Sequence, residues 1–342
     1  MSKVYFYPIN TQDNQKLGLA ALKTLKSVLE TEGKTLQPQL GIKVHFGEKG
    51  NHTFIPATCY DPVIDYLKSS HIEPSYIETN VLYRGARTTL DHHVALAHNH
   101  GFTQIPIIIA DGEKGTDYNE IPIDKDFIKS CKIGKAYENF SQYLVFSHFK
   151  GHAGAGFGGA LKQLAMGFAA RGGKLAQHSD ISPIVNAKKC IVCGLCVEKC
   201  DVDAIRLEEA AVIDSDLCIG CAGCIAVCPE GAIRNDWGGS NFLQKIAEYA
   251  YGAALNKDNI YISFIHNITA DCDCMGKSMD CIADNIGIMA STDPVALDTA
   301  CLDVLQQTTH ERLFESGRPT LHHAEKIGLG SMTYHLIKIQ GE

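Results

Sequence analysis

Two cysteine runs near the middle of the chain constrain its fold more than any other feature. Each run has the spacing CxxCxxCxxxC, which brings three thiolates close together on one short loop. The first run consists of Cys190, Cys193, Cys196 and Cys200, and the second consists of Cys218, Cys221, Cys224 and Cys228. A loop of this kind can hold three corners of a metal–sulfur cube, and the fourth ligand must come from further along the chain. The segment is therefore expected to form a small cysteine-ligated unit.

The spacing resembles that of two-cluster bacterial ferredoxins, in which the fourth cysteine of each run ligates the other cluster. By that pattern, one 4Fe-4S cluster is held by Cys190, Cys193, Cys196 and Cys228, and the other by Cys218, Cys221, Cys224 and Cys200. Zinc is the competing interpretation, but structural zinc sites usually use two separated cysteine pairs. Asp201 departs from the pattern, since Pro229 follows the second run. Proline shapes the turn without binding iron, so both clusters remain expected.

Length, composition and charge limit the class of protein. The chain has 342 residues, of which 45% are hydrophobic, and this is enough for a large core. Its length and cysteine spacing argue against a secreted disulfide scaffold. No stretch reaches the roughly 20 apolar residues of a membrane span, and the first residues carry no cleavage signature. We therefore expect a cytoplasmic protein.

The net charge of −8 argues against a nucleic-acid-binding surface. An acidic surface would suit docking to a basic redox protein partner, and ordinary solubility explains the same charge equally well.

Outside the cysteine runs, apolar residues alternate between strand and helix periodicity. Strands are expected at 4–7, 40–45, 76–78, 105–109, 143–146, 260–265 and 286–289, and helices at 15–29, 62–67, 89–98, 160–169, 242–254 and 295–305. This alternation predicts an α/β fold with a mostly parallel sheet and covering helices. We assign residues 1–187 and 235–342 to one discontinuous α/β domain, interrupted by a small α+β ferredoxin-like insert at 188–234. Two α/β domains flanking the insert are the alternative.

Polar residues follow one predicted strand after another. They include Lys43, His45, Asn80, His148, His266 and Asp293. Because ligands of open parallel sheets bind beyond the carboxyl ends of the strands, these side chains are expected to gather at one edge. A single histidine is more often structural than functional, so the prediction of a small-molecule site depends on the recurrence.

A glycine-rich loop precedes the predicted helix at 160–169. Gly154, Gly156 and Gly159 fit the spacing GxGxxG, and Lys162 follows. Such a loop can hold an anion on the amides of a helix start. The acidic residue and second strand of a dinucleotide fold do not follow, so tight packing or a flexible loop is an equal alternative.

A second cysteine group lies at Cys272 and Cys274, with Cys281 downstream and His266 upstream. Three interpretations compete: a further metal or cluster site, a redox-active pair, and buried structural thiols. The neighbouring acids, Asp271, Asp273 and Asp280, are expected to raise the pKa of these thiols, which argues against a reactive nucleophile.

Five stretches resemble the family labelled Domain of Unknown Function 362. They are residues 42–56, residues 79–88, Ser147 to Gly167, Asn267 to Gly276 and Ile286 to Ala300. Members often carry a two-cluster ferredoxin insert. The resemblance implies that one site contains Lys43, His45, Asn80, His148, Lys162, His266, Cys272, Cys274 and Asp293, and it implies no particular reaction.

Three functions are consistent with these features. The first is an iron–sulfur electron-transfer protein that relays single electrons to a partner or to the α/β domain. The second is a redox enzyme whose α/β domain binds a small anion or an extra metal, with Cys272, Cys274 and His266 as candidate catalytic residues. The third is a protein whose clusters are structural or sense oxygen.

Overall fold

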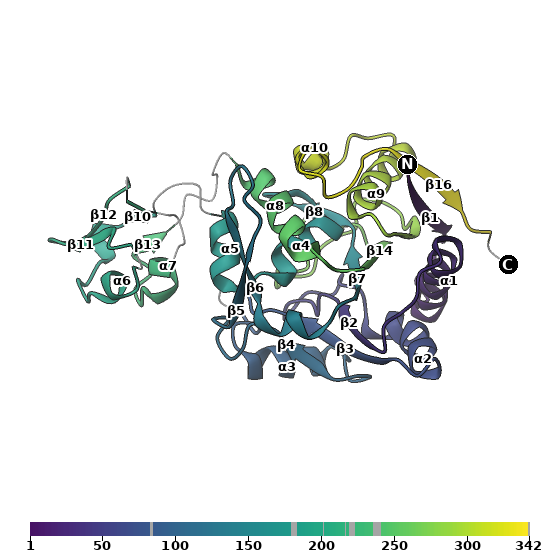
Figure 1. Ribbon diagram of the computed structural model, residues 1–342, viewed down its shortest axis with the longest axis horizontal. Helices are drawn as coiled ribbons and strands as arrows, with labels where there is room; N and C mark the ends of the chain where they lie inside the picture. The colour runs from purple at the N-terminus through teal and green to yellow at the C-terminus, as the bar shows by residue number, and fades with distance from the viewer. Residues whose placement is uncertain are drawn as a thin grey trace.

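A mostly parallel sheet of eight strands forms the centre of the molecule, with helices on both faces (Figure 1). The structure is a computed structural model that describes residues 1–82, 85–178, 183–200, 202–215, 217–218, 223–234 and 241–340. The sheet and its covering helices confirm the predicted α/β fold class.

The sheet strands occupy a spatial order that differs from their order in the chain. In space they are β16 (Tyr334–Lys338), β1 (Ser2–Pro8), β15 (Gly287–Ser291), β14 (Ile260–Ile265), β7 (Tyr143–His148), β2 (Gln39–Lys43), β3 (Glu73–Glu78) and β4 (Ile107–Ile109). All neighbours run parallel except β15, which is antiparallel to both β14 and β1.

Alternating side chains of the central strands pack into two separate cores. In β7, Tyr143 and Val145 belong to the core on one face, and Leu144 and Phe146 belong to the core on the other. This follows from strand geometry, because successive side chains point to opposite faces. All six residues of β7 are buried, as expected for a parallel strand covered on both sides.

The helices divide between the two faces. One face is covered by α1 (Asn14–Glu32), α2 (Asp61–Ser69) and α3 (Leu90–Asn99), and the other by α4 (Ala160–Phe168), α5 (Arg171–His178), α8 (Phe242–Ala254), α9 (Pro294–Thr309) and α10 (Arg318–Lys326) (Figure 1). Two hairpins complete this part of the molecule, namely β5 (Tyr118–Pro122) with β6 (Ser130–Gly134), and β8 (Lys150–His152) with β9 (Gly156–Gly158).

The ends of α1 show why the sequence forms this helix where it does. Asp13 precedes it and accepts hydrogen bonds from the amides of Gln15 and Lys16, which satisfies two donors that the helix leaves unpaired. Gly33 ends it at φ +62°, a left-handed conformation that suits glycine. Between the caps, the apolar stripe that includes Leu17 and Leu25 faces the core.

The direction of β15 corrects one expectation about the sheet. Residues 266–286 connect β14 to β15, and this described segment contains no helix. Parallel neighbours need a crossover connection, usually helical, whereas neighbours joined by a loop on one edge run antiparallel. The carboxyl end of β15 therefore lies at the opposite edge of the sheet from those of β2, β3, β7 and β14.

The cysteine-rich segment forms a small lobe at one end of the molecule, on the left of Figure 1. Its described elements are β10 (Ile184–Val185), α6 (Leu195–Glu198), β11 (Ile205–Leu207), β12 (Ala211–Ile213), α7 (Gly223–Val227) and β13 (Ile233–Arg234). The strand β10 pairs with β13, and β11 pairs with β12. The first pairing places Ile184 in the lobe, ahead of the predicted boundary at residue 188.

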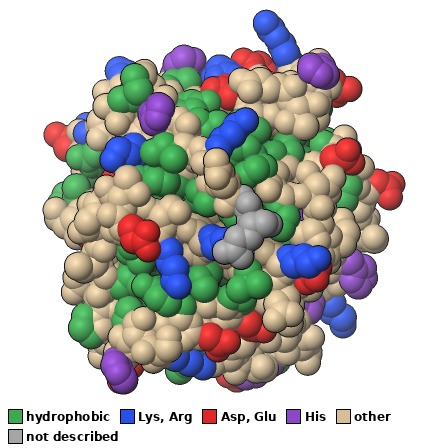
Figure 2. All heavy atoms as spheres, turned by 90° about the vertical axis from the view of Figure 1, so that its right-hand side faces the viewer, with side chains coloured by type: hydrophobic (Ala, Val, Ile, Leu, Met, Phe, Trp, Pro, Cys, Tyr) green, Lys and Arg blue, Asp and Glu red, His purple; other side chains and the backbone are tan. Residues whose placement is uncertain are grey.

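The face opposite the lobe mixes charges of both signs. Figure 2 views the side on which α1 and β16 lie, where basic and acidic side chains are interspersed with apolar ones. Among the described residues, none of the helices combines the length and apolar character needed to cross a membrane.

Candidate functional site

A cavity of about 440 Å³ opens at the carboxyl ends of β2, β3 and β7 and beside the loop that follows β14. Its walls combine apolar groups such as Tyr60, Phe146 and Met166 with an unusual concentration of charged and polar ones. The polar lining includes His45, Glu78, Arg87, His148, Lys150, His152, Lys162, Lys174, Cys272, Asp273 and Cys274. Of the predicted site residues, the cavity thus brings together His45, His148, Lys162, Cys272 and Cys274.

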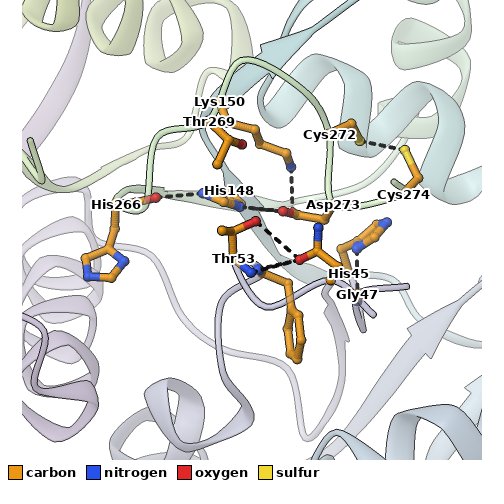
Figure 3. Close-up of polar contacts among 12 residues, drawn as sticks. His45, Gly47, Thr53, His148, Lys150, His266, Thr269, Cys272, Asp273 and Cys274 are labelled. Carbon is orange, nitrogen blue, oxygen red and sulfur yellow. Dashed lines mark hydrogen bonds and ion pairs between the residues drawn. The ribbon is translucent and has the colours of Figure 1, made fainter. Parts of the chain in front are cut away.

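Asp273 anchors the loop after β14 to the end of β7. Its carboxylate accepts from His148 Nδ1 at 2.9 Å and from Lys150 Nζ at 2.8 Å, and all three side chains are buried (Figure 3). Burial alone would raise the pKa of Asp273, but the neighbouring His148 and Lys150 hold it well below its usual range. The ion pair with Lys150 weakens the effect on the neighbouring thiols that was expected of Asp273.

His148 itself lies between two acceptors. Its Nδ1 faces Asp273, and its Nε2 lies 2.6 Å from the backbone oxygen of His266. The ring of His148 thus bridges the carboxylate of Asp273 and the backbone at the end of β14.

Cys272 and Cys274 face each other at the cavity wall. The thiol of Cys274 donates to Cys272 Sγ across 2.7 Å (Figure 3). Lys162 Nζ lies 3.5 Å from Cys272 Sγ. The hydrogen bond from Cys274, together with Lys162 and Lys150, lowers the pKa of Cys272 well below its usual value despite burial. The pKa of Cys274 is raised by the same pairing and by burial. The arrangement therefore corresponds to one thiolate and one thiol.

His152 completes a group that has the composition of a metal site. A ring nitrogen of His152 and the two cysteine sulfurs all lie within 4.8 Å of one another. His152 Nδ1 also accepts from the amides of Gly154 and Ala155, at 3.2 and 2.9 Å. Burial and nearby Lys162 lower the pKa of His152 to about 3, so its ring is neutral.

The glycine loop does not present helix-start amides to a ligand. It forms the β8–β9 hairpin, and α4 begins after it at Ala160. The amides of Ala160 and Leu161 donate instead to the carboxylate of Asp298, at 2.7 and 2.9 Å. The expectation of an anion held on these amides is wrong, because a side chain from α9 already occupies that position.

Two predicted residues support the cavity from beneath. Lys43 is fully buried and donates to Glu78 Oε1 at 2.8 Å. Asn80 donates to Asp111 Oδ1 and to the backbone oxygen of Gly112. Neither Lys43 nor Asn80 lines the cavity, so each affects the cavity only through the groups to which it is hydrogen-bonded.

His266 and Asp293 do not reach the cavity as predicted. The ring of His266 turns away from the cysteines, with Nε2 lying 3.0 Å from the oxygen of Thr11 (Figure 3). Asp293 lies at the opposite sheet edge because β15 is antiparallel. There its carboxylate accepts from the amides of Val295 and Ala296 and so caps α9. Cys281 is exposed and is absent from the cavity lining.

Two cationic residues of the cavity were not predicted. Lys174 Nζ donates to the backbone oxygens of Asn80 and Ala169, and burial lowers its pKa to about 8. Arg87 lies between Glu48 and His45 Nε2, at 3.1 and 2.9 Å. Burial and Arg87 lower the pKa of His45 well below its usual value. Arg87 lies within residues 79–88, one of the stretches that resemble the family, whereas nothing in the local pattern around Lys174 indicates a site.

The first predicted ligand set gathers around one small cavity in the lobe. Its lining includes Cys190, Cys193, Cys196 and Cys228. Backbone amides also face three cysteine sulfurs of the lobe, and the pairs are Ala211 with Cys190, Ala204 with Cys200, and Ala232 with Cys228. Cys218 and Cys224 are described, while Cys221 lies outside the described residues. Ile225, on α7, lines the large cavity of the α/β domain.

Together, the sheet, the strand-end cavity and the cysteine-rich lobe define an α/β protein with a cationic site facing a small second unit. Residues 40–303 match the family described as "Domain of unknown function (DUF362)", and the chain belongs to that family. A search of curated proteins found no match.

Among solved structures, a protein from Thermotoga maritima is similar at a TM-score of 0.43 and 8% sequence identity. The match covers 93% of this chain and 60% of that one, so this chain spans less than two thirds of that protein's length.

Proposed function

We propose that this protein transfers single electrons, through two 4Fe-4S clusters in its lobe, to the cavity of the α/β domain. One cluster would be held by Cys190, Cys193, Cys196 and Cys228, and the other by Cys218, Cys221, Cys224 and Cys200. When bound, such clusters supply one-electron redox chemistry. The residues of the chain hold the clusters, shield them and bring one side of the lobe to the cavity.

The position of Cys228 carries this proposal. It belongs to the second run, yet it lines the same small cavity as the first three cysteines of the first run. Ligation of each cluster across the two runs requires this placement. The amides directed at the sulfurs of Cys190, Cys200 and Cys228 also support it, because hydrogen bonds to ligand sulfurs help to set cluster potentials.

The link to the cavity is supported by α7. This helix contains Cys224, a predicted ligand of the second cluster, and its neighbour Ile225 lines the large cavity. Cys272 and Cys274 line the same cavity. Electrons leaving the second ligand set would therefore have a short route into the site.

Metal analysis of protein prepared without oxygen tests the proposal. We expect about eight iron atoms per chain, brown colour and a paramagnetic signal after reduction with dithionite. The variant Cys193→Ser should lose iron, whereas the control Cys281→Ser, which alters another exposed cysteine, should keep it. Colourless protein that contains zinc alone would contradict the proposal. Clusters that resist reduction would favour a structural or oxygen-sensing role instead.

A redox enzyme acting on a small anion is the second candidate function, and the charge of the cavity favours it. Lys150, Lys162, Lys174 and Arg87 all line the cavity. Their positive charges attract an anionic ligand and hold it near Cys272. Thermal shift measurements with small dicarboxylates at low salt test this, and Lys162→Gln should weaken the response. The absence of any response from the unaltered protein would count against an anion site.

A further inference from the structure

The cavity wall around Cys272 is built to hold a thiolate. Cys274 donates its thiol hydrogen to Cys272 Sγ at 2.7 Å, and the Lys162 ammonium lies 3.5 Å from the same sulfur. Cys272 is buried, whereas Cys274 and Lys162 are partly exposed. A second thiol thus lies within reach of the first, beside a positive charge and next to a cavity that can admit a substrate.

The surroundings favour redox chemistry over a bound metal. Lys150 and Lys162 both line the cavity beside Cys272, and their charges repel a metal cation. The tautomer of His152 also argues against a bound metal. A metal-bound histidine normally donates from its second nitrogen, whereas His152 Nδ1 accepts from two backbone amides. The neutral ring therefore carries its hydrogen on Nε2, where it is a donor rather than a ligand.

We propose that Cys272 and Cys274 form a dithiol–disulfide couple that reduces the disulfide bond of a small anionic substrate bound in the cavity. This inference rests on the proposed electron-transfer function, since the clusters would supply the electrons. It deepens that function by assigning the residues that accept the electrons and the class of substrate that they reduce.

The chemistry balances with two electrons per turnover. The Cys272–Cys274 disulfide takes up two electrons and one proton, which leaves Cys272 as the thiolate and Cys274 as the thiol. Cys272 Sγ then attacks one sulfur of the substrate, breaks its disulfide bond and releases the other half as a thiolate. Cys274 gives its proton to that thiolate and attacks Cys272 Sγ. The second half leaves as a thiolate, which solvent protonates, and the Cys272–Cys274 disulfide forms again.

The close spacing of the two cysteines suits this role. A disulfide that closes over a single intervening residue is strained, and strained disulfides are oxidising and readily reduced. Each cluster carries one electron, so the two clusters together supply the two electrons that reduce one disulfide. Lys162 lines the cavity and would bind a carboxylate of the substrate. Lys150 and Lys174 donate to protein oxygens and add positive charge to the same wall.

Equilibration in dithiothreitol redox buffers, followed by alkylation and peptide mass spectrometry, tests the couple. Cys272 and Cys274 fall on one tryptic peptide, residues 258–277, and Cys281 falls on the next. We expect both thiols of the first peptide to be lost and regained together in one two-electron transition, while Cys281 stays reduced. If Cys272 and Cys274 remain alkylatable after treatment with diamide, or if stoichiometric metal leaves with Cys272→Ser, the couple is excluded.

Lys162 provides a second readout, because it stabilises only the reduced form. Lys162→Gln should shift the equilibrium about tenfold toward the disulfide, which lowers the midpoint potential by about 30 mV. Lys162→Arg keeps the charge, so its midpoint potential should lie close to that of the unaltered protein. An unchanged potential in Lys162→Gln would contradict the role given to Lys162.

The substrate class is tested with two small disulfides of opposite charge. Protein reduced with dithionite should cleave 3,3′-dithiodipropionate at least tenfold faster than cystamine, and Lys162→Gln should narrow that ratio. Equal rates would overturn the anionic preference. The dithiothreitol titration does not depend on iron, so loss of the clusters and failure of the thiol couple give different results.

Discussion

Asp273 Oδ2 lies 2.9 Å from His148 Nδ1, and this contact joins the loop that carries the two cysteines to the end of the central strand β7. The aspartate lies between Cys272 and Cys274 in the sequence, so its side chain holds the loop while the neighbouring thiols line the cavity. Lys150 Nζ binds the same carboxylate at 2.8 Å. The geometry of the cysteine pair therefore depends on a buried ionic contact beneath it.

Replacing Asp273 with asparagine should destabilise the protein and displace the loop. The change leaves Lys150 and His148 buried without their counter-charge, and breaking a buried ion pair in this way typically costs about 3–5 kcal/mol. Denaturant unfolding measures the loss. Asp271→Asn, on the same loop, is the matched control and should cost much less. Equal stability of Asp273→Asn and the unaltered protein would contradict the anchoring role.

The same carboxylate should contribute to acid unfolding. Its pKa in the folded protein lies well below the usual range because of His148 and Lys150. A carboxyl group of this kind stabilises the fold above its unfolded pKa of about 3.9, and the contribution is lost as pH falls toward the folded value. The melting temperature should therefore fall more steeply for the unaltered protein than for Asp273→Asn when it is measured in steps of about one pH unit from about pH 5 to about pH 2.

Asp298 should have the opposite pH dependence. Burial raises its pKa to about 7, although its carboxylate accepts from the amides of Ala160 and Leu161. Because the folded pKa exceeds the unfolded one, stability declines as pH rises from about 4 toward 7. The asparagine of Asp298→Asn stays neutral at every pH, so the melting temperature of this variant should fall less over that range than that of the unaltered protein. Parallel curves for the two proteins would show that Asp298 does not titrate in this range.

Gly159 should tolerate no side chain. A Cβ atom there would clash with Asp298 Oδ1, which accepts from the amide of Ala160 at the start of α4. Gly159→Ala should therefore destabilise the protein by about 1–3 kcal/mol, the usual cost of forcing extra atoms into a packed site. Gly172→Ala is the control, because its nearest neighbour is Lys132 Cδ at 3.5 Å and α5 gains a better helix former. Equal unfolding midpoints for the two variants would contradict this prediction.

Ile225 tests the connection between the lobe and the cavity. It lines the cavity from α7, next to Cys224. Ile225→Asp adds a negative charge where an anionic substrate would enter, so the KM for 3,3′-dithiodipropionate should rise several-fold while the iron content stays constant. Ile184→Asp changes an exposed apolar side chain of the lobe that does not line the cavity, and it should leave the KM unchanged. Loss of iron in Ile225→Asp alone would instead assign the residue to the fold of the lobe.

Much of the fold follows from local sequence patterns. The apolar run of β7 and the apolar stripe of α1 are each encoded by residues a few positions apart, so these local patterns predict strand and helix directly. The grouping of His45 and His148 was also predicted, because each lies at or just beyond the carboxyl end of a strand, and the family resemblance implied that Lys162, Cys272 and Cys274 belong to the same site. These strands are parallel, and their ends meet at one edge.

The remaining features depend on contacts between distant parts of the chain. The direction of β15 is set by a connection without a helix, and this single reversal moves Asp293 to the far edge. The ring of His266 turns to Thr11, and the carboxylate of Asp298 occupies the start of α4. The positions of the strands and helices and the spacing of the cysteines are local properties, so they can be read from the chain alone. Which charges meet in the cavity depends on burial and long-range packing, so the partners become known only once the chain is folded.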